Sequence, residues 1–89
     1  MKAYLHHTAE KYLNRLNASD RESIKAAIKD LEEEPPKGDI RPYVGKPGSW
    51  RLKASSFRIL YEIEDNIILV THIEPRGQAY TKKTRSRRG

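Results

Sequence analysis

The chain has 89 residues, of which 36% are hydrophobic and 34% charged, and it carries a formal net charge of +6 with no cysteine. This length predicts one domain with a small core, and the lack of cysteine excludes a disulfide framework, a thiolate nucleophile and a cysteine-based zinc site. The sequence has neither an apolar run of about 18 residues nor the apolar core of a signal peptide, so we expect a cytoplasmic protein without a membrane partner.

The first part of the chain predicts a short strand and then a helix. Residues 2–7 can form the strand, and the Thr8 hydroxyl can accept a hydrogen bond from a free amide of the first helical turn. Apolar side chains then recur at helical spacing in one stripe, which comprises Ala9, Tyr12, Leu13 and Leu16.

A second helix is predicted directly after the first. Ser19 and Glu22 have the spacing of a capping box, in which each side chain satisfies a free backbone amide of the first turn. The apolar stripe that follows comprises Ile24, Ala27, Ile28 and Leu31. Pro35 and Pro36 end this helix, so residues 9–33 predict a helical hairpin.

Residues 34–49 predict an extended, turn-rich connection. They contain four of the five prolines of the chain. Such a connection is long for a small domain, which suggests that it is either functional or mobile.

Residues 50–63 alternate between apolar and other side chains, which predicts two strands around a short turn. One face receives the apolar set, which comprises Trp50, Leu52, Ala54, Phe57, Ile59, Tyr61 and Ile63. The opposite face receives three cations, Arg51, Lys53 and Arg58. These cations either form ordinary solvated surface or bind a polyanion.

Residues 67–73 are almost continuously apolar, which is typical of a central strand. The element order is then β-α-α-β-β-β, an α+β fold in which the helical hairpin packs on one face of a small, mainly antiparallel sheet. The other face stays uncovered and carries the three cations. A basic domain of this kind attracts phosphate polymers, although an acidic protein partner is the alternative interpretation of the charge.

The chain resembles the RelE/ParE superfamily of toxins from type II toxin–antitoxin pairs in four stretches: HTAEKYLNRL, PYVGKPGSW, WRLKASSFRILYEI and HIEPRGQAY. The family pattern is a strand with alternating basic residues, an aromatic–arginine pair that opens the next strand, and a closing Arg-x-x-x-Tyr. These features are matched by Arg51 and Lys53, by Phe57 and Arg58, and by Arg76 and Tyr80. The resemblance implies a RelE-like fold, with one toxin domain over residues 1–81 and a basic, flexible tail over residues 82–89.

The basic strand and the late tyrosine are most similar to the RelE-like branch, whose members cut mRNA in the ribosomal A site. This resemblance implies a metal-independent endoribonuclease without a cofactor, in which the RNA 2′-hydroxyl attacks the adjacent phosphate. Tyr80 would be the general base, Arg58 would clamp the phosphate, and Arg76 would stabilise the leaving group or the transition state. Lys53 completes the implied catalytic set.

The resemblance also implies that Arg51 and Lys53 bind the RNA backbone, and the charge of the tail adds Lys82 and Lys83 as residues that contact RNA non-specifically. The implied partners are mRNA, the ribosome and an acidic, RelB-like antitoxin that forms a hetero-oligomer with the toxin. The alternative functions are a ParE-like inhibitor of DNA gyrase without nuclease activity and a non-catalytic RNA-binding protein.

Simpler roles remain open for several of these side chains. Tyr80 can pack its ring under the C-terminal segment, and Arg58 can be an exposed strand residue paired with Glu62. His72 can transfer a proton or can be a strand residue without a chemical role.

Overall fold

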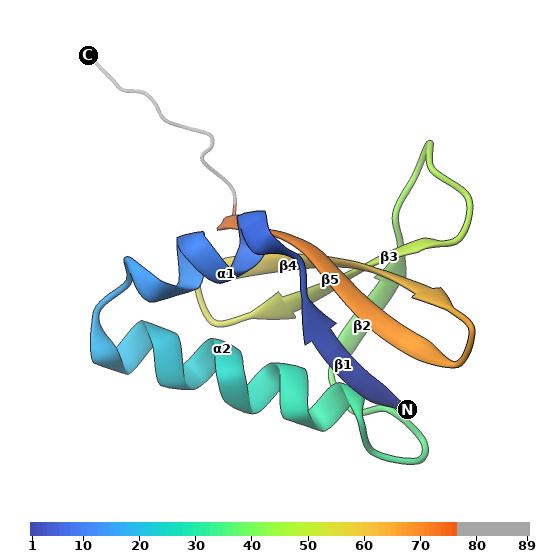
Figure 1. The fold of residues 1–89 in the computed structure, drawn as a ribbon, viewed down its shortest axis with the longest axis horizontal. Coiled ribbons are helices and arrows are strands. Elements are labelled where there is room, and N and C mark those ends of the chain that lie inside the picture. The colour runs from blue at the N-terminus through green and yellow to red at the C-terminus, as the bar shows by residue number, and fades with distance from the viewer. Residues whose placement is uncertain (77–89) are drawn as a thin grey trace.

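The computed structural model describes residues 1–76, which form one five-stranded sheet with two helices on one of its faces (Figure 1). The elements in chain order are β1 (Lys2–Leu5), α1 (His7–Asn14), α2 (Ala18–Leu31), β2 (Asp39–Pro42), β3 (Ser49–Ala54), β4 (Phe57–Glu64) and β5 (Ile67–Pro75).

The strand order across the sheet is β1-β5-β4-β3-β2. β1 pairs with β5 in parallel, and the other three pairings are antiparallel. The predicted α+β fold, with a helical hairpin on a mainly antiparallel sheet, is therefore confirmed. None of the helices within residues 1–76 is long and apolar enough to cross a membrane.

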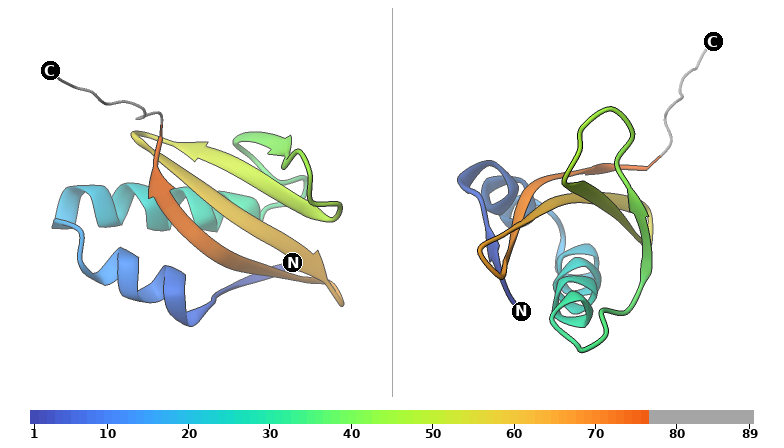
Figure 2. Two further views of the ribbon diagram at one scale, coloured as in Figure 1. Left: turned by 90° about the horizontal axis from the view of Figure 1, so that it is seen from above. Right: turned by 90° about the vertical axis from the view of Figure 1, so that its right-hand side faces the viewer.

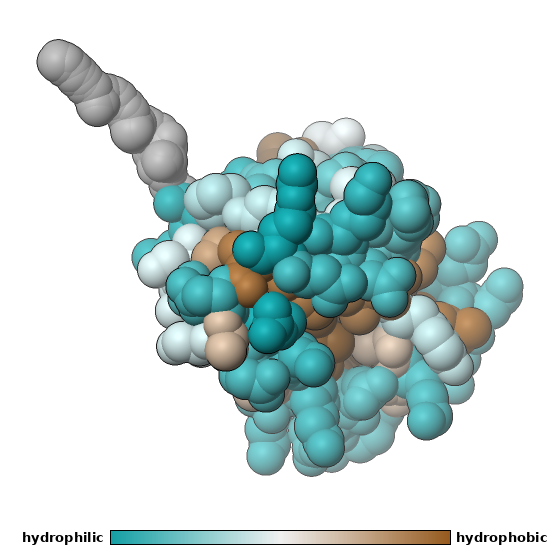
Figure 3. Space-filling model, turned by 60° about the vertical axis from the view of Figure 1, so that its left-hand side comes forward, coloured by the Kyte–Doolittle hydropathy of each residue, from teal (hydrophilic) through white to brown (hydrophobic). Residues whose placement is uncertain are grey.

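The core lies between the helices and the concave side of the curved sheet, which arches over α2 (Figure 2). Both predicted helical stripes contribute to it, because Ala9, Leu13, Ile24, Ile28 and Leu31 are buried. The alternating strand residues Leu52, Phe57, Ile59 and Tyr61 are also buried and face the helices. Figure 3 shows a face on which hydrophilic side chains predominate, with apolar atoms exposed in a narrow band among them.

Strand β2 was not predicted. It lies inside the segment that we expected to be an extended, turn-rich connection, and it adds an antiparallel edge strand beside β3. Gly38 precedes it with φ +128°, and Pro42 is its last residue. The proline has no amide donor, so it fits the end of an edge strand.

Both helices begin at a different cap from the predicted one. The His6 ring nitrogen Nδ1 accepts a hydrogen bond from the Thr8 amide at 3.2 Å, and Asn17 Oδ1 accepts from the Asp20 amide at 2.8 Å. The backbone of these two capping residues is extended, as capping requires. Thr8 and Ser19 instead lie within the first helical turns, so their predicted roles as caps are wrong.

Candidate nucleic-acid interface

The sheet face opposite the helices, here called the open face, carries its charged residues in rows that cross the strands. Asp39 of β2 is the register partner of Lys53 on β3, and Lys53 is the partner of Arg58 on β4. Arg58 is in turn the partner of Glu74 on β5. These four residues, the first row, therefore bring together two predicted site residues that are separated by a turn in the sequence.

The two cations of the first row are both paired with carboxylates. Arg58 donates from Nε to Glu74 Oε2 at 2.9 Å, and its Nη2 donates to the same oxygen. Lys53 Nζ lies 3.5 Å from Asp39 Oδ2. Glu74, not Glu62, is thus the partner of Arg58, and Glu62 pairs with Lys46 at 3.1 Å.

Asp39 links the first row to a second row. Its Oδ1 accepts a hydrogen bond from Arg41 Nε at 3.3 Å. This bond is the largest cause of the lowered pKa of the Asp39 carboxyl; desolvation opposes the shift, and the contact with Lys53 adds to it. Asp39 therefore stays ionised between two cations.

The second row consists of Arg41, Arg51, Leu60 and His72, which are register partners across β2, β3, β4 and β5. Two arginines thus face each other across neighbouring strands, an arrangement that is normally destabilising. Within residues 1–76, the Arg51 side chain makes no ion pair and no hydrogen bond. Arg41 was missed by the sequence analysis, although the pattern Asp39-Ile40-Arg41 alternates as a strand does.

Arg76 is held at the end of the first row. Its Nη1 donates to the Ser55 carbonyl at 2.6 Å, and its backbone amide donates to the Ser56 carbonyl at 2.8 Å. Ser55 and Ser56 form the turn between Lys53 and Arg58. We call Lys53, Arg58 and Arg76 the cationic corner, because the turn brings all three to one end of the open face.

Three predicted site residues, Tyr80, Lys82 and Lys83, lie outside the described residues. Two described tyrosines have a raised pKa: burial, followed by the charges of Asp20 and Glu74, raises that of Tyr12, and burial raises that of Tyr61. A raised pKa keeps a phenol protonated, so neither of these two is suited to act as a base.

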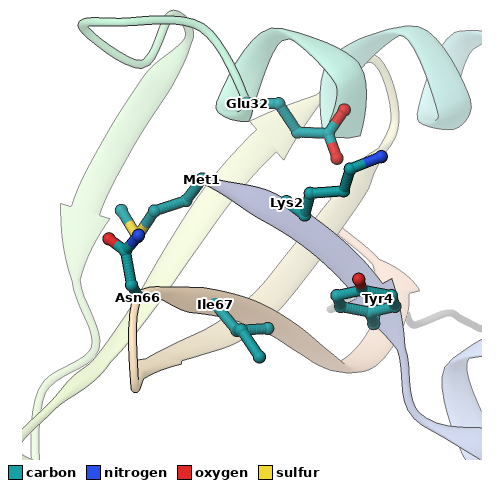
Figure 4. A pocket seen from close by; sticks show the side chains of 6 residues that line it. All are labelled: Met1, Lys2, Tyr4, Glu32, Asn66 and Ile67. Carbon is teal, nitrogen blue, oxygen red and sulfur yellow. The ribbon is translucent and has the colours of Figure 1, made fainter.

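The half of the open face near β1 differs from the rest, because its cation Lys2 lies among apolar side chains. The parallel register places Lys2 beside Ile67 and Tyr4 beside Leu69, and Tyr4 is 52% exposed. A pocket at this end is lined by Met1, Lys2, Tyr4, Glu32, Asn66 and Ile67 (Figure 4). The cations that were expected on the uncovered face are therefore concentrated on its β2–β3 side and at the start of β4.

The chain matches the model of one protein family over residues 3–80. That family is described as the ParE toxin of the type II toxin–antitoxin system parDE. A comparison with curated proteins finds no match.

Several solved structures share the fold. The archaeal RelE–RelB complex from Pyrococcus horikoshii is similar over 86% of this chain and 96% of that chain, with a TM-score of 0.72 and 23% identity. The RelB–RelE antitoxin–toxin complex from Methanococcus jannaschii has a TM-score of 0.69 and 22% identity over 85% of this chain and 93% of that chain. A YoeB/ParE toxin from Agrobacterium tumefaciens has a TM-score of 0.70 and 19% identity over 86% of this chain and all of that chain. These likenesses show the fold.

Proposed function

The chain belongs to the family of ParE toxins of type II toxin–antitoxin systems, and we propose that this toxin is a ribosome-dependent endoribonuclease that cuts mRNA in the A site. In the proposed reaction the RNA 2′-hydroxyl loses its proton and attacks the adjacent phosphorus. The bond from phosphorus to the 5′-oxygen breaks, and that oxygen takes up a proton. The products are a 2′,3′-cyclic phosphate and a 5′-hydroxyl.

The cationic corner is the observation that supports this proposal most directly. Lys53 and Arg58 are register partners on the uncovered face, and Arg76 is bonded to the turn that joins their strands. A phosphate placed there would lie beside Lys53 and Arg58 on neighbouring strands and near Arg76 just after β5, and the planar guanidinium of Arg58 suits two phosphoryl oxygens. Stabilisation of the extra negative charge on the pentacoordinate phosphorus would then be the main contribution to catalysis.

Glu74 gives this site a preference for the transition state. The Glu74 carboxylate already accepts hydrogen bonds from Arg58, so a phosphate has to displace this carboxylate. The transition state carries more negative charge than the bound phosphodiester and competes better for Arg58. Arg58 therefore stabilises the transition state more than the substrate, which is the condition for raising the rate of the chemical step.

Tyr80 is the proposed general base. It follows Arg76 by four residues, and four residues of chain span at most about 14 Å, which is enough to reach the cationic corner. Nearby cations favour the ionised form of a phenol, so the cationic corner would favour the phenolate of Tyr80 that accepts the proton of the 2′-hydroxyl. The ribosome would supply the remaining orientation of the mRNA, and this substrate implies action in the cytoplasm.

An acidic, RelB-like antitoxin is the proposed partner. Two of the structural relatives are complexes of a RelE toxin with a RelB antitoxin. An acidic segment that orders on binding would neutralise the cations of the open face and exclude RNA from them. The same surface would then serve the substrate and the inhibitor.

Inhibition of DNA gyrase is the second candidate function. It is favoured by the ion pairs of the first row, where Asp39 and Glu74 offset the charges of Lys53 and Arg58. It is also favoured by the exposed Tyr4 and Ile67, because apolar side chains suit a protein partner better than RNA.

Mapping mRNA ends after induced expression separates these functions. The nuclease proposal predicts new 5′ ends inside translated codons within minutes of induction, and their loss in the Tyr80→Phe variant. Intact mRNA together with inhibited supercoiling by purified gyrase would instead establish the second candidate.

A further inference from the structure

We infer that Arg41 and Arg51 form a second phosphate-binding subsite, which holds the phosphodiester next to the one that is cut. The inference rests on the proposed function, because it assigns a further contact with the same single-stranded RNA. It adds strand β2 to the interface, and neither Arg41 nor this strand belongs to the catalytic set proposed above.

The position of the two arginines is the first argument. Arg41 and Arg51 are register partners on adjacent antiparallel strands, so their side chains project from the same face within reach of a common anion. Like charges in this arrangement repel each other. A bound phosphate removes that repulsion and gains charge-assisted hydrogen bonds from both guanidinium groups.

The hydrogen bonding of the two side chains is the second argument. Arg41 uses Nε to reach Asp39, which fixes its guanidinium and leaves its terminal nitrogens for another acceptor. Arg51 makes no ion pair or side-chain hydrogen bond in the part of the chain that the structure describes. One arginine is thus held in position, and the other has its full set of donors available.

The spacing to the cationic corner is the third argument. Arg51 and Lys53 are two residues apart on β3, which corresponds to about 6.7 Å along a strand. This separation is comparable with that of neighbouring phosphates on an extended single strand. An RNA that runs along β3 can therefore place one phosphate at the corner and the next at the Arg41–Arg51 subsite.

The rest of the second row suits a nucleotide. Leu60 lies beside Arg51 on β4, and the exposed His72 lies beside Leu60 on β5. They offer an apolar surface and an imidazole ring on which an unstacked base can lie. The next residue along this face of β4 is Glu62, whose carboxylate pairs with Lys46 and would repel a third phosphate.

Binding of a single-stranded RNA octanucleotide to the full chain tests the subsite. The RNA carries a 2′-deoxy sugar at the cleavage position, so that it binds without being cut. Arg41→Gln is expected to weaken binding about tenfold, the effect of losing one charge-assisted hydrogen-bond contact, and to reduce the slope of log K against log salt by about 0.7. Lys25→Gln is the matched control, because it removes one positive charge from the exposed side of α2 and is expected to change binding little.

Neutral methylphosphonate linkages in the RNA locate the contact without altering the protein. A neutral linkage next to the cleavage position is expected to weaken binding to the wild-type chain and to cost the Arg41→Gln variant less, because only Arg51 then remains to contact that phosphate. Equal binding by wild type and Arg41→Gln, or additive losses from the variant and that linkage, would overturn the subsite alone. An absence of salt-dependent RNA binding by the wild-type chain would also overturn the subsite, whereas cleavage of mRNA on the ribosome decides the proposed function.

Discussion

Arg58 and Glu74 are register partners on β4 and β5, and one carboxylate oxygen of Glu74 accepts hydrogen bonds from both Nε and Nη2 of Arg58. The side chains are 31% and 36% exposed, so the pair is accessible to a competing anion. The residue proposed to bind the scissile phosphate is thus held by an internal carboxylate until a substrate replaces it.

Removal of this internal competitor should tighten RNA binding. A partly exposed ion pair of this kind contributes up to about 1 kcal/mol, so Glu74→Gln is expected to increase RNA affinity by roughly two- to fivefold. Glu22→Gln is the control, because it makes the same charge change on α2, at an exposed carboxylate that pairs with Lys25. Fluorescence anisotropy with labelled RNA measures both variants. Equal gains would mean that net charge alone matters and that Glu74 does not compete with the phosphate.

Strand β2 depends on Gly38. A Cβ added at this residue would lie 2.6 Å from Leu52 Cδ1, whereas a Cβ at Gly45 would meet nothing within 4 Å. Both glycines have positive φ, +128° and +90°, so alanine strains the backbone at either position. Gly38→Ala is expected to lose about 1–3 kcal/mol more free energy of unfolding than Gly45→Ala. Urea denaturation compares the two variants, and equal losses would contradict the close packing of β2 on Leu52.

The cap of α2 can be tested with two alanine variants. Asn17→Ala removes the side chain that accepts from the Asp20 amide and is expected to lower the free energy of unfolding by about 1 kcal/mol. Ser19 is the second residue of α2, and Ser19→Ala is expected to change the free energy of unfolding by less than about 0.5 kcal/mol. If thermal denaturation showed the larger loss for Ser19→Ala, the helix would begin at the capping box that the sequence suggested.

Asp39 links the two rows, and its contribution to the stability of the fold should depend on pH. The folded-state pKa of Asp39 is lowered, so its ionised carboxyl stabilises the fold above the unfolded value of about 3.9 and loses this effect as the pH falls through the lower folded-state pKa. At neutral pH we expect wild type to melt at a slightly higher temperature than Asp39→Asn. The two melting curves should converge below the folded-state pKa, and a difference that persists in acid would show that the carboxyl acts through packing.

Much of this fold could be predicted from periodicity, because the stripe with Ile24 and Ile28 and the alternation from Trp50 to Ile63 each have one apolar face. Strand β2 was missed because Pro42 and Pro47 are typical of loops, and nothing in the sequence showed that the extended residues 39–42 pair with β3. The true caps were missed because Thr8 and Ser19 have good capping side chains, whereas the extended backbone that capping requires belongs to His6 and Asn17.

The pairing of Arg58 with Glu74 could not be predicted for a different reason. The register of β4 with β5 shifts between Leu60 and Tyr61. A shift of one residue changes which side chains face each other, and no local pattern in the sequence marks its position. The residues of the cationic corner could therefore be identified from the sequence. The pairing of Arg58 with Glu74 and the position of Arg41 beside Arg51 became visible only from the register of the sheet.

Single-turnover cleavage of mRNA in the A site of purified ribosomes tests the central claim most directly. Arg58→Ala is expected to reduce the cleavage rate by about a hundredfold or more, the effect of removing one donor that stabilises transition-state charge. Lys25→Ala, which removes an exposed cation from α2 on the helical side, is expected to cut at the wild-type rate. Cleavage by Arg58→Ala at the wild-type rate would contradict the assignment of the cationic corner as the place where RNA is cut.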